Sequence, residues 1–321
     1  MNYKPIIVVS GEPNSIFLEI FFKAIKEKIN SPLILICSLK LLKLQMSHFK
    51  FKRGIRILDV KKMNTYKLDN SLINIIDVKY DVFKKFEPIS NKSSKYIKES
   101  FSIAFKLIKS GYTNKMINGP ISKKYFLNKK FPGITEFIAN EFSREKVGML
   151  IYNKSLSVCP LTTHLPIKLI PKKITKKLII EKITLINAFY KSLFNKKPKI
   201  GVVGLNPHCE STSKINEDDK IIRPAIKQIS NKNIKVSGPY PADTIFLKNN
   251  RKNFDVIVGM YHDQVLTPIK TLFGFDAINI TIGLPFIRIT PDHGPNYKMF
   301  GLNKSKPDSL IQAFDFLNKY V

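Results

Sequence analysis

The stretch that decides the fold runs from residue 259 to residue 288 and reads GMYHDQVLTPIKTLFGFDAINITIGLPFIR. It follows the apolar run Phe254–Val258, which predicts a short buried strand. Residues 263–273 predict a helix, and the apolar run Ala277–Ile282 predicts a second strand. In an open α/β sheet, strand ends present their polar side chains to a cleft. We therefore expect a functional cleft where the first of these strands ends.

The same stretch carries polar side chains that suit a small anionic ligand beside a metal. His262 and Asp263 come directly after the first strand, and Asp263 lies seven residues before Lys270, which places both on one face of the helix. Asn279 lies within the second strand, and Arg288 follows soon after. The plainer interpretation is a histidine that caps a helix, together with solvated charges.

Strands and helices alternate along the whole chain, from a strand at Ile6–Val9 to a C-terminal helix over residues 306–320. Apolar residues at helical spacing predict helices over residues 93–109 and 172–194, and we expect another helix to start at Ala242. This alternation predicts the α/β class. The first strand ends in GEPNS, residues 11–15, which lacks the three glycines of a dinucleotide fingerprint. At 321 residues the chain is long enough for two lobes or one large α/β unit.

Three of the five histidines share one sequence context. His164, His208 and His262 each follow an apolar strand-like run and lie at the start of a loop or helix. Because the ends of parallel strands meet at one edge of a sheet, these rings could gather around a catalytic zinc or a similar divalent ion. Their spacing of 44 and 54 residues matches no short metal motif, so three unrelated polar residues remain the alternative.

The charge of the chain is strongly positive, with 54 basic against 24 acidic residues and a net charge of +30. This balance invites a nucleic-acid interpretation. The basic residues are spread along the chain instead of forming a stripe, so we expect only weak, non-specific polyanion binding and no specific nucleic-acid partner. The same charge attracts acidic or phosphorylated small substrates.

The compartment is indicated by what the sequence lacks. The N-terminus MNYKPIIVVSGEP has no signal-peptide pattern, and no apolar run reaches the roughly 18 residues that span a bilayer. The three cysteines, Cys37, Cys159 and Cys209, form no CxxC pair, which favours reduced thiols. We therefore expect a cytoplasmic protein that has no membrane partner.

Several words of the sequence resemble the 4-hydroxythreonine-4-phosphate dehydrogenase family of pyridoxal phosphate biosynthesis. They are, in chain order, NGPISKK (118–124), GITEF (133–137), LTTHLP (161–166), GLNPHCE (204–210), GPYPADTIF (238–246), GMYHDQ (259–264) and DHG (292–294). The resemblance covers nearly the whole chain, and its most specific parts are YHDQ and NPH.

The resemblance implies a three-layer α/β/α fold of two lobes, similar to isocitrate and isopropylmalate dehydrogenases. We expect residues 1–115 and 290–321 to form the cofactor lobe, and residues 116–289 to form the lobe with the metal, the substrate and the dimer interface. The family is a homodimer with a shared active site, and it uses NAD or NADP without the glycine-rich fingerprint.

The resemblance also implies roles for particular residues. The divalent metal, which could be zinc, magnesium or cobalt, would be held by His164, His208 and His262, one of them from the other subunit. Substrate would be bound by Thr135, Lys270, Asn279 and Arg288, and the cofactor by Asp292, His293 and Gly294. Lys270, Asp243 and Asp263 are the candidate catalytic groups, and for the two aspartates a purely structural role is the alternative.

The implied reaction oxidises and decarboxylates 4-phosphohydroxy-L-threonine to 3-amino-2-oxopropyl phosphate. One departure bears on it: the family usually has a histidine where this chain has Ile134. A sister dehydrogenase that acts on D-threonate or D-erythronate 4-phosphate is therefore an alternative. A metal-dependent hydrolase or transferase of phosphorylated metabolites is another.

Overall fold

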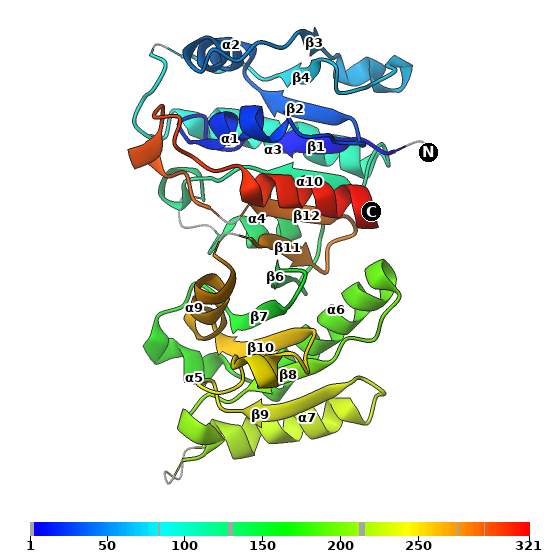
Figure 1. The fold of residues 1–321 in the computed structure, drawn as a ribbon, viewed down its shortest axis with the longest axis vertical. Coiled ribbons are helices and arrows are strands. Elements are labelled where there is room, and N and C mark those ends of the chain that lie inside the picture. Colours follow the sequence, from blue (N-terminus) through cyan, green and yellow to red (C-terminus); the bar gives the residue numbers. More distant parts are fainter. Residues whose placement is uncertain (1–2, 83, 128–130, 212–215, 275, 292) are drawn as a thin grey trace. The chain divides into compact units, whose positions relative to one another are not determined.

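The chain forms two compact units, drawn as a ribbon in Figure 1. Unit 1 comprises Met1–Phe137 and Pro285–Val321, and unit 2 comprises Ile138–Leu284. The structure is a computed structural model that describes residues 3–82, 84–127, 131–211, 216–274, 276–291 and 293–321.

Unit 1 contains six parallel strands in the order β3-β4-β2-β1-β5-β12. The strands are β1 (Ile6–Val9), β2 (Leu33–Cys37), β3 (Ile55–Ile57), β4 (Ile73–Asp77), β5 (Lys115–Asn118) and β12 (Ile287–Pro291). The helices are α1 (Phe17–Ala24), α2 (Leu39–His48), α3 (Ser93–Lys109), α10 (Asp308–Tyr320) and α4 (Ile134–Glu141), which contains the boundary with unit 2.

Unit 1 buries the β-branched side chains of its central strands beneath helices. Every residue of β1 and β2 is buried, as expected for strands that are covered on both faces. In Figure 1, α1 lies in front of β1, α10 lies in front of β12, and α3 lies behind the strands. The C-terminal helix is tied down by Lys115, whose Nζ donates to the Leu317 carbonyl over 3.1 Å.

The unit boundaries differ from the expected lobes. We expected residues 116–289 to form the second lobe, but residues 116–137 and 285–289 belong to unit 1. The reason is strand pairing, because β5 lies between β1 and β12 in the unit 1 sheet. This assignment also places Thr135 and Arg288 in the same unit.

Unit 2 contains six strands in the order β11-β6-β7-β10-β8-β9. Its strands are β6 (Gly148–Tyr152), β7 (Ser157–Thr162), β8 (Ile200–Val203), β9 (Val236–Tyr240), β10 (Val256–Tyr261) and β11 (Ile278–Ile282). Its helices are α5 (Ile170–Lys173), α6 (Lys176–Phe194), α7 (Arg223–Ser230), α8 (Lys248–Arg251) and α9 (His262–Phe273). Four of the strands, β7, β10, β8 and β9, are parallel neighbours, whereas β6 runs antiparallel to both of its neighbours, β7 and β11.

The β10–α9 connection forms as the opening stretch of sequence predicts. Tyr261 keeps extended backbone angles, His262 begins α9, and the helix ends at Gly274, whose φ of 59° favours glycine. A side chain on Gly259 would meet Val265 Cγ1 at 2.4 Å, so only glycine lets α9 pack this closely over β10. The buried face of α9, which includes Leu266, then joins the core of unit 2.

Three local expectations change in the structure. The single helix expected over residues 172–194 is two helices, because Thr175 is extended and caps α6 by accepting a hydrogen bond from Leu178 N. The helix start expected at Ala242 is wrong, because residues 242–246 form turns. Helix α2 was not expected, because lysines interrupt its apolar residues and obscure the helical spacing. Ser38 caps this helix by accepting a hydrogen bond from Leu41 N.

The α/β class is confirmed by the strands of both units and the helices that alternate with them along the chain. Among the described residues, no helix combines the length and the apolar character that crossing a membrane requires.

Candidate active site

Two of the predicted metal-binding histidines lie side by side in unit 2. The centroids of the His164 and His262 rings are 6.0 Å apart. The register explains this proximity, because β7 and β10 are parallel neighbours in which Thr162 pairs with Tyr261. The turns that leave these two strands therefore start level with each other.

His262 is oriented by its neighbour in the chain. Its Nδ1 lies 2.7 Å from Asp263 Oδ1, and a carboxylate in this position can only accept, so that Nδ1 carries the hydrogen. Nε2 is then the ring nitrogen available to a metal. Asp263 therefore fixes the orientation of the His262 ring.

His208 lies at the end of β8, in a tight turn formed by Pro207–Cys209. Both His208 and Cys209 have left-handed backbone angles, with φ of 55° and 59°. Two successive non-glycine residues in this region store strain that their surroundings must offset. The imidazole of His208 is exposed, whereas Cys209 is buried.

The histidine pair fits part of a divalent metal site. Metal–nitrogen bonds of about 2.1 Å place the centroids of two ligating imidazoles roughly 4.5–5.5 Å apart. The His164 and His262 centroids, 6.0 Å apart, lie slightly beyond that spacing, so a small movement of the rings would bring both onto one ion. In the part of the chain that the structure describes, no group of three histidine, cysteine or acidic side chains is arranged to hold a metal ion. A third ligand is needed to complete the site.

The other predicted polar groups of unit 2 lie on neighbouring elements. Lys270 is exposed on α9, the helix that His262 begins. Asn279 lies on β11, and its buried Oδ1 accepts no hydrogen bond from the described residues. Asp243 is exposed in the turn after β9. Its charge acts on Cys209: the pKa of that thiol is raised mainly by burial, then by Asp218, and by a smaller amount by Asp243.

In unit 1 the predicted substrate residues form a buried cluster around Arg288. Its side chain is fully buried, its Nε donates to Asn118 Oδ1 over 2.8 Å, and its Nη1 donates to Thr135 Oγ1 over 3.3 Å. Burial lowers the pKa of the Arg288 guanidinium to about 9, against a smaller opposing effect of Glu136. The group stays charged at neutral pH, as phosphate or carboxylate binding requires.

The predicted cofactor segment follows β12. His293 Nδ1 donates to the Gly294 carbonyl over 3.0 Å, and Gly294 is exposed. Asp292 lies outside the described residues. The segment is attached to the start of α1, because Ile16 N donates to the Pro295 carbonyl over 3.2 Å.

Glu12 is a buried carboxyl group that sequence reasoning treated only as part of a turn. It is 1% exposed, accepts hydrogen bonds from Ser93 Oγ over 3.0 Å and Asn14 N over 3.4 Å, and joins the end of β1 to the start of α3. Burial raises its pKa to about 7, although both hydrogen bonds oppose the shift. Its backbone N–H donates to the Pro120 carbonyl over 2.8 Å.

Glu12 and Asn118 are the groups that the sequence prediction missed. Each stands just after or at the end of an apolar strand-like run, the same context that identified the histidines. That signal could have found them.

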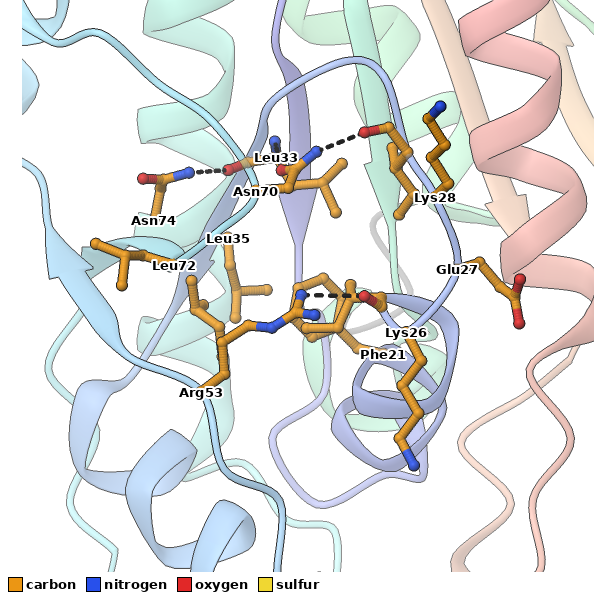
Figure 2. Close-up of a pocket in the computed structure, with 13 residues that line it drawn as sticks. Phe21, Lys26, Glu27, Lys28, Leu33, Leu35, Arg53, Asn70, Leu72 and Asn74 are labelled. Atoms are coloured by element: carbon orange, nitrogen blue, oxygen red, sulfur yellow. Dashed lines mark hydrogen bonds between the residues drawn. The ribbon is translucent and has the colours of Figure 1, made fainter.

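Unit 1 also contains a cavity of about 300 Å³ at the other edge of its sheet (Figure 2). It lies beside Leu33, the first residue of β2, and therefore at the amino ends of the strands. Asn70 donates to the Ile29 carbonyl and accepts from Leu33 N, and Arg53 donates to the Ile25 carbonyl. These polar groups hold the surrounding backbone, so we assign the cavity a structural character.

Comparisons with known proteins identify the family of this chain. The family profile described as "Pyridoxal phosphate biosynthetic protein PdxA" matches residues 28–317. A 4-hydroxythreonine-4-phosphate dehydrogenase from Sulfurihydrogenibium sp. is 37% identical over 318 residues, which cover 96% of this chain and 95% of that protein. One from Bradyrhizobium diazoefficiens is also 37% identical, over 66% of this chain and 64% of its own length.

Solved structures give the same result. The 4-hydroxythreonine-4-phosphate dehydrogenase of Klebsiella pneumoniae superposes with a TM-score of 0.84 at 26% identity, and that of Burkholderia phymatum with 0.80 at 26% identity. In both comparisons 98% of each chain is covered. The profile match, the near full-length relative and the shared fold together show that this chain belongs to the PdxA family of pyridoxal phosphate biosynthetic proteins.

Proposed function

We propose that this chain is a metal-dependent NAD(P) dehydrogenase that oxidises and decarboxylates 4-phosphohydroxy-L-threonine to 3-amino-2-oxopropyl phosphate. The observation that carries the proposal is the pair formed by His164 and His262, with Asp263 orienting His262, in a chain of this family. A dehydrogenase of this kind needs a group that holds the reacting hydroxyl, positive charge for the phosphate, and a nicotinamide that accepts the hydride.

The described residues suit these tasks. A divalent cation, when bound, supplies Lewis-acid polarisation of the substrate hydroxyl. Asp263 keeps the Nδ1 hydrogen of His262, which leaves Nε2 as a ligand nitrogen. The buried Arg288 guanidinium provides a fixed, desolvated charge for phosphate or carboxylate, and Thr135 aligns it. Lys270 and Asn279 add a second positive charge and an amide to the residues that we propose bind the substrate.

We further propose that the active site is completed in a homodimer. The segment that follows His164 exposes apolar side chains, with Ile167 at 77%, Leu165 at 38% and Leu169 at 37%. Exposed apolar side chains next to a functional residue are typical of an interaction surface. A second copy of the chain would bury them and could bring the third imidazole, so that His208 and the pair belong to different subunits.

The free, buried cysteines suit a reducing cytoplasm.

The test is an absorbance assay. Purified protein, NAD or NADP, the phosphorylated substrate and Zn²⁺, Mg²⁺ or Co²⁺ should generate reduced nicotinamide, and EDTA should abolish the signal. Failure with this substrate and every metal would contradict the proposed reaction.

A sister substrate is favoured by one observation. Ile134 begins α4 directly before Thr135, where the family usually has an imidazole. An apolar side chain at this position withdraws a polar substrate contact, which would matter less for a substrate without the amino group. D-threonate 4-phosphate and D-erythronate 4-phosphate belong in the same assay, and faster turnover with either would reassign the substrate.

A further inference from the structure

Side-chain hydrogen bonds connect the three segments of unit 2 that carry His164, His208 and His262. The residues that make these bonds have no role in the proposed function so far. The turns follow β7, β8 and β10, which are adjacent parallel strands with β10 in the middle. Backbone pairing stops where the strands end, so the positions of the turns beyond that edge depend on other contacts.

Gln264 links the ends of β10 and β8. Its Oε1 accepts a hydrogen bond from Met260 N over 2.7 Å, and its Nε2 donates to the Gly204 carbonyl over 2.8 Å. Met260 lies two residues before His262, and Gly204 lies four residues before His208. One amide therefore satisfies a donor on one turn and an acceptor on the other, which a carboxylate or an apolar side chain cannot do.

Asp218 holds the turn that carries His208. It is fully buried, and its two oxygens accept hydrogen bonds from Leu205 N over 2.9 Å, from Asn206 N over 3.1 Å and from Asn206 Nδ2 over 2.9 Å. A side chain on Gly204 would approach Asp218 Oδ1 to 2.6 Å, so the glycine makes room for the carboxylate. These bonds fix the backbone that leads into the strained residue His208.

Thr162 makes the third link. Its Oγ1 donates to the Met260 carbonyl over 2.8 Å, which connects the end of β7, two residues before His164, to the end of β10. The main chain of Met260 is thus bonded on both sides, by Thr162 through its carbonyl and by Gln264 through its N–H.

We propose that Gln264, with Asp218 and Thr162, is a positioning residue that fixes each histidine turn within its own subunit, and thereby the affinity and geometry of the metal site that two subunits complete. This inference rests on the proposed function, because it assumes that these histidines bind a divalent metal. It adds to that function a set of residues that touch neither metal nor substrate. Gln264 is central because its amide links β10 to β8. The turns after β7 and β10 are already in contact through the His164 and His262 rings.

The test uses Co²⁺ as the probe, because its visible absorption reports ligand number and geometry. Full-length wild type and Gln264→Leu are titrated with Co²⁺, and the dissociation constant and the spectrum are recorded. We expect the variant to bind Co²⁺ about 10- to 100-fold more weakly, the range typical of residues that support metal ligands, and with a changed spectrum. Asp218→Asn, which keeps the shape and one acceptor oxygen, should show a smaller change in the same direction and serves if Gln264→Leu does not fold.

Tyr190→Phe is the matched control. It removes a buried hydrogen bond of unit 2, from Tyr190 Oη to Ser157 Oγ over 2.9 Å, at the amino end of β7. It should lower stability without altering Co²⁺ affinity or the spectrum. An unchanged affinity and spectrum in both test variants would overturn this inference alone. A wild-type protein that binds no Co²⁺ would overturn the proposed metal role and this inference with it.

Discussion

The two units end their strands in different ways. In unit 1 the polar groups at and after the ends of β5 and β1 are buried and bonded within the chain: Asn118 with Arg288, and Glu12 with Ser93. In unit 2 the corresponding groups reach solvent, with His262 at 36% and Asp263 at 78% exposure. A buried charge must be satisfied by its own unit, whereas exposed imidazoles beside exposed apolar residues can be completed from outside. Unit 1 thus satisfies these buried polar groups within the unit, whereas the ligand set that we propose in unit 2 is incomplete.

The largest effect should come from removing a ligand of the incomplete set. His262→Ala deletes one ring of the pair, and we expect metal affinity to fall at least about 1,000-fold, beyond the 10- to 100-fold typical of supporting residues. Calorimetric titration with Zn²⁺ measures it. His48→Ala is the control, because His48 packs between Phe49 and Phe86 in unit 1. Equal Zn²⁺ affinity in both variants would mean that His262 is not a metal ligand, and the proposed ligand set of unit 2 would be wrong.

The buried carboxyl of unit 1 should make stability depend on pH. The pKa of Glu12 rises from 4.5 to about 7 on folding, so the unfolded chain releases this proton first. Stability therefore falls as pH rises from about 4.5 to 7, by about 3 kcal/mol in total. Glu12→Gln should remove this dependence and be more stable than wild type at pH 8, as urea unfolding at several pH values would show.

Glu99→Gln is the comparison for that experiment. Glu99 is exposed on α3, the helix that Glu12 contacts through Ser93. This variant should keep the wild-type pH dependence. If Glu12→Gln loses stability with pH as steeply as Glu99→Gln does, Glu12 is not the group responsible.

A substrate-binding effect is expected at Arg288. Arg288→Gln keeps an amide where Nε donates to Asn118 but removes the charge and the Nη1 contact to Thr135. A hydrogen bond to a charged group contributes about 2 kcal/mol. The KM for the phosphorylated substrate should rise roughly 30-fold, with a smaller change in the KM for NAD. Arg56→Gln, at an exposed hydrogen bond to the Lys67 carbonyl, should leave both constants unchanged. A shift confined to the cofactor would contradict our assignment of Arg288.

The smallest effect concerns Ile134. Ile134→His adds an imidazole to the first residue of α4, next to Thr135. One neutral hydrogen bond contributes about 1 kcal/mol, so the KM for 4-phosphohydroxy-L-threonine should fall about fivefold. The same change should not help a substrate that lacks the amino group. A uniform effect on all substrates would mean that Ile134 does not influence which one is preferred.

Local patterns predicted much of the fold. Helix α3 was expected over residues 93–109 and is found there, because Ile97, Phe101 and Phe105 mark one buried face. The same reasoning failed for α2, in which lysines separate the apolar residues. It also failed at Ala242, where a polar turn looks like a helix start.

For the site, the sequence could identify groups but not their partners. The sequence predicted that His164 and His262 lie near each other, because each follows an apolar strand-like run and the ends of parallel strands meet at one edge of a sheet. The structure places the two rings side by side. The bond from Gln264 to Gly204 joins residues 60 apart, and the one from Arg288 to Asn118 joins residues 170 apart. Such contacts depend on which strands become neighbours, and a single sequence does not state that order.

The discontinuous path of unit 1 has a consequence for synthesis on the ribosome. Unit 2 is one continuous segment, so all of its strands have emerged once residue 284 has left the exit tunnel. Unit 1 must wait for β12, which pairs with β5, and for α10, which packs on α1. Because domains tend to fold as they emerge, the nascent chain would carry an ordered middle between two unfinished ends. Until Leu317 arrives, the ammonium group of Lys115 lacks the carbonyl that it will meet in the folded protein, which makes the last helix the closing step of assembly.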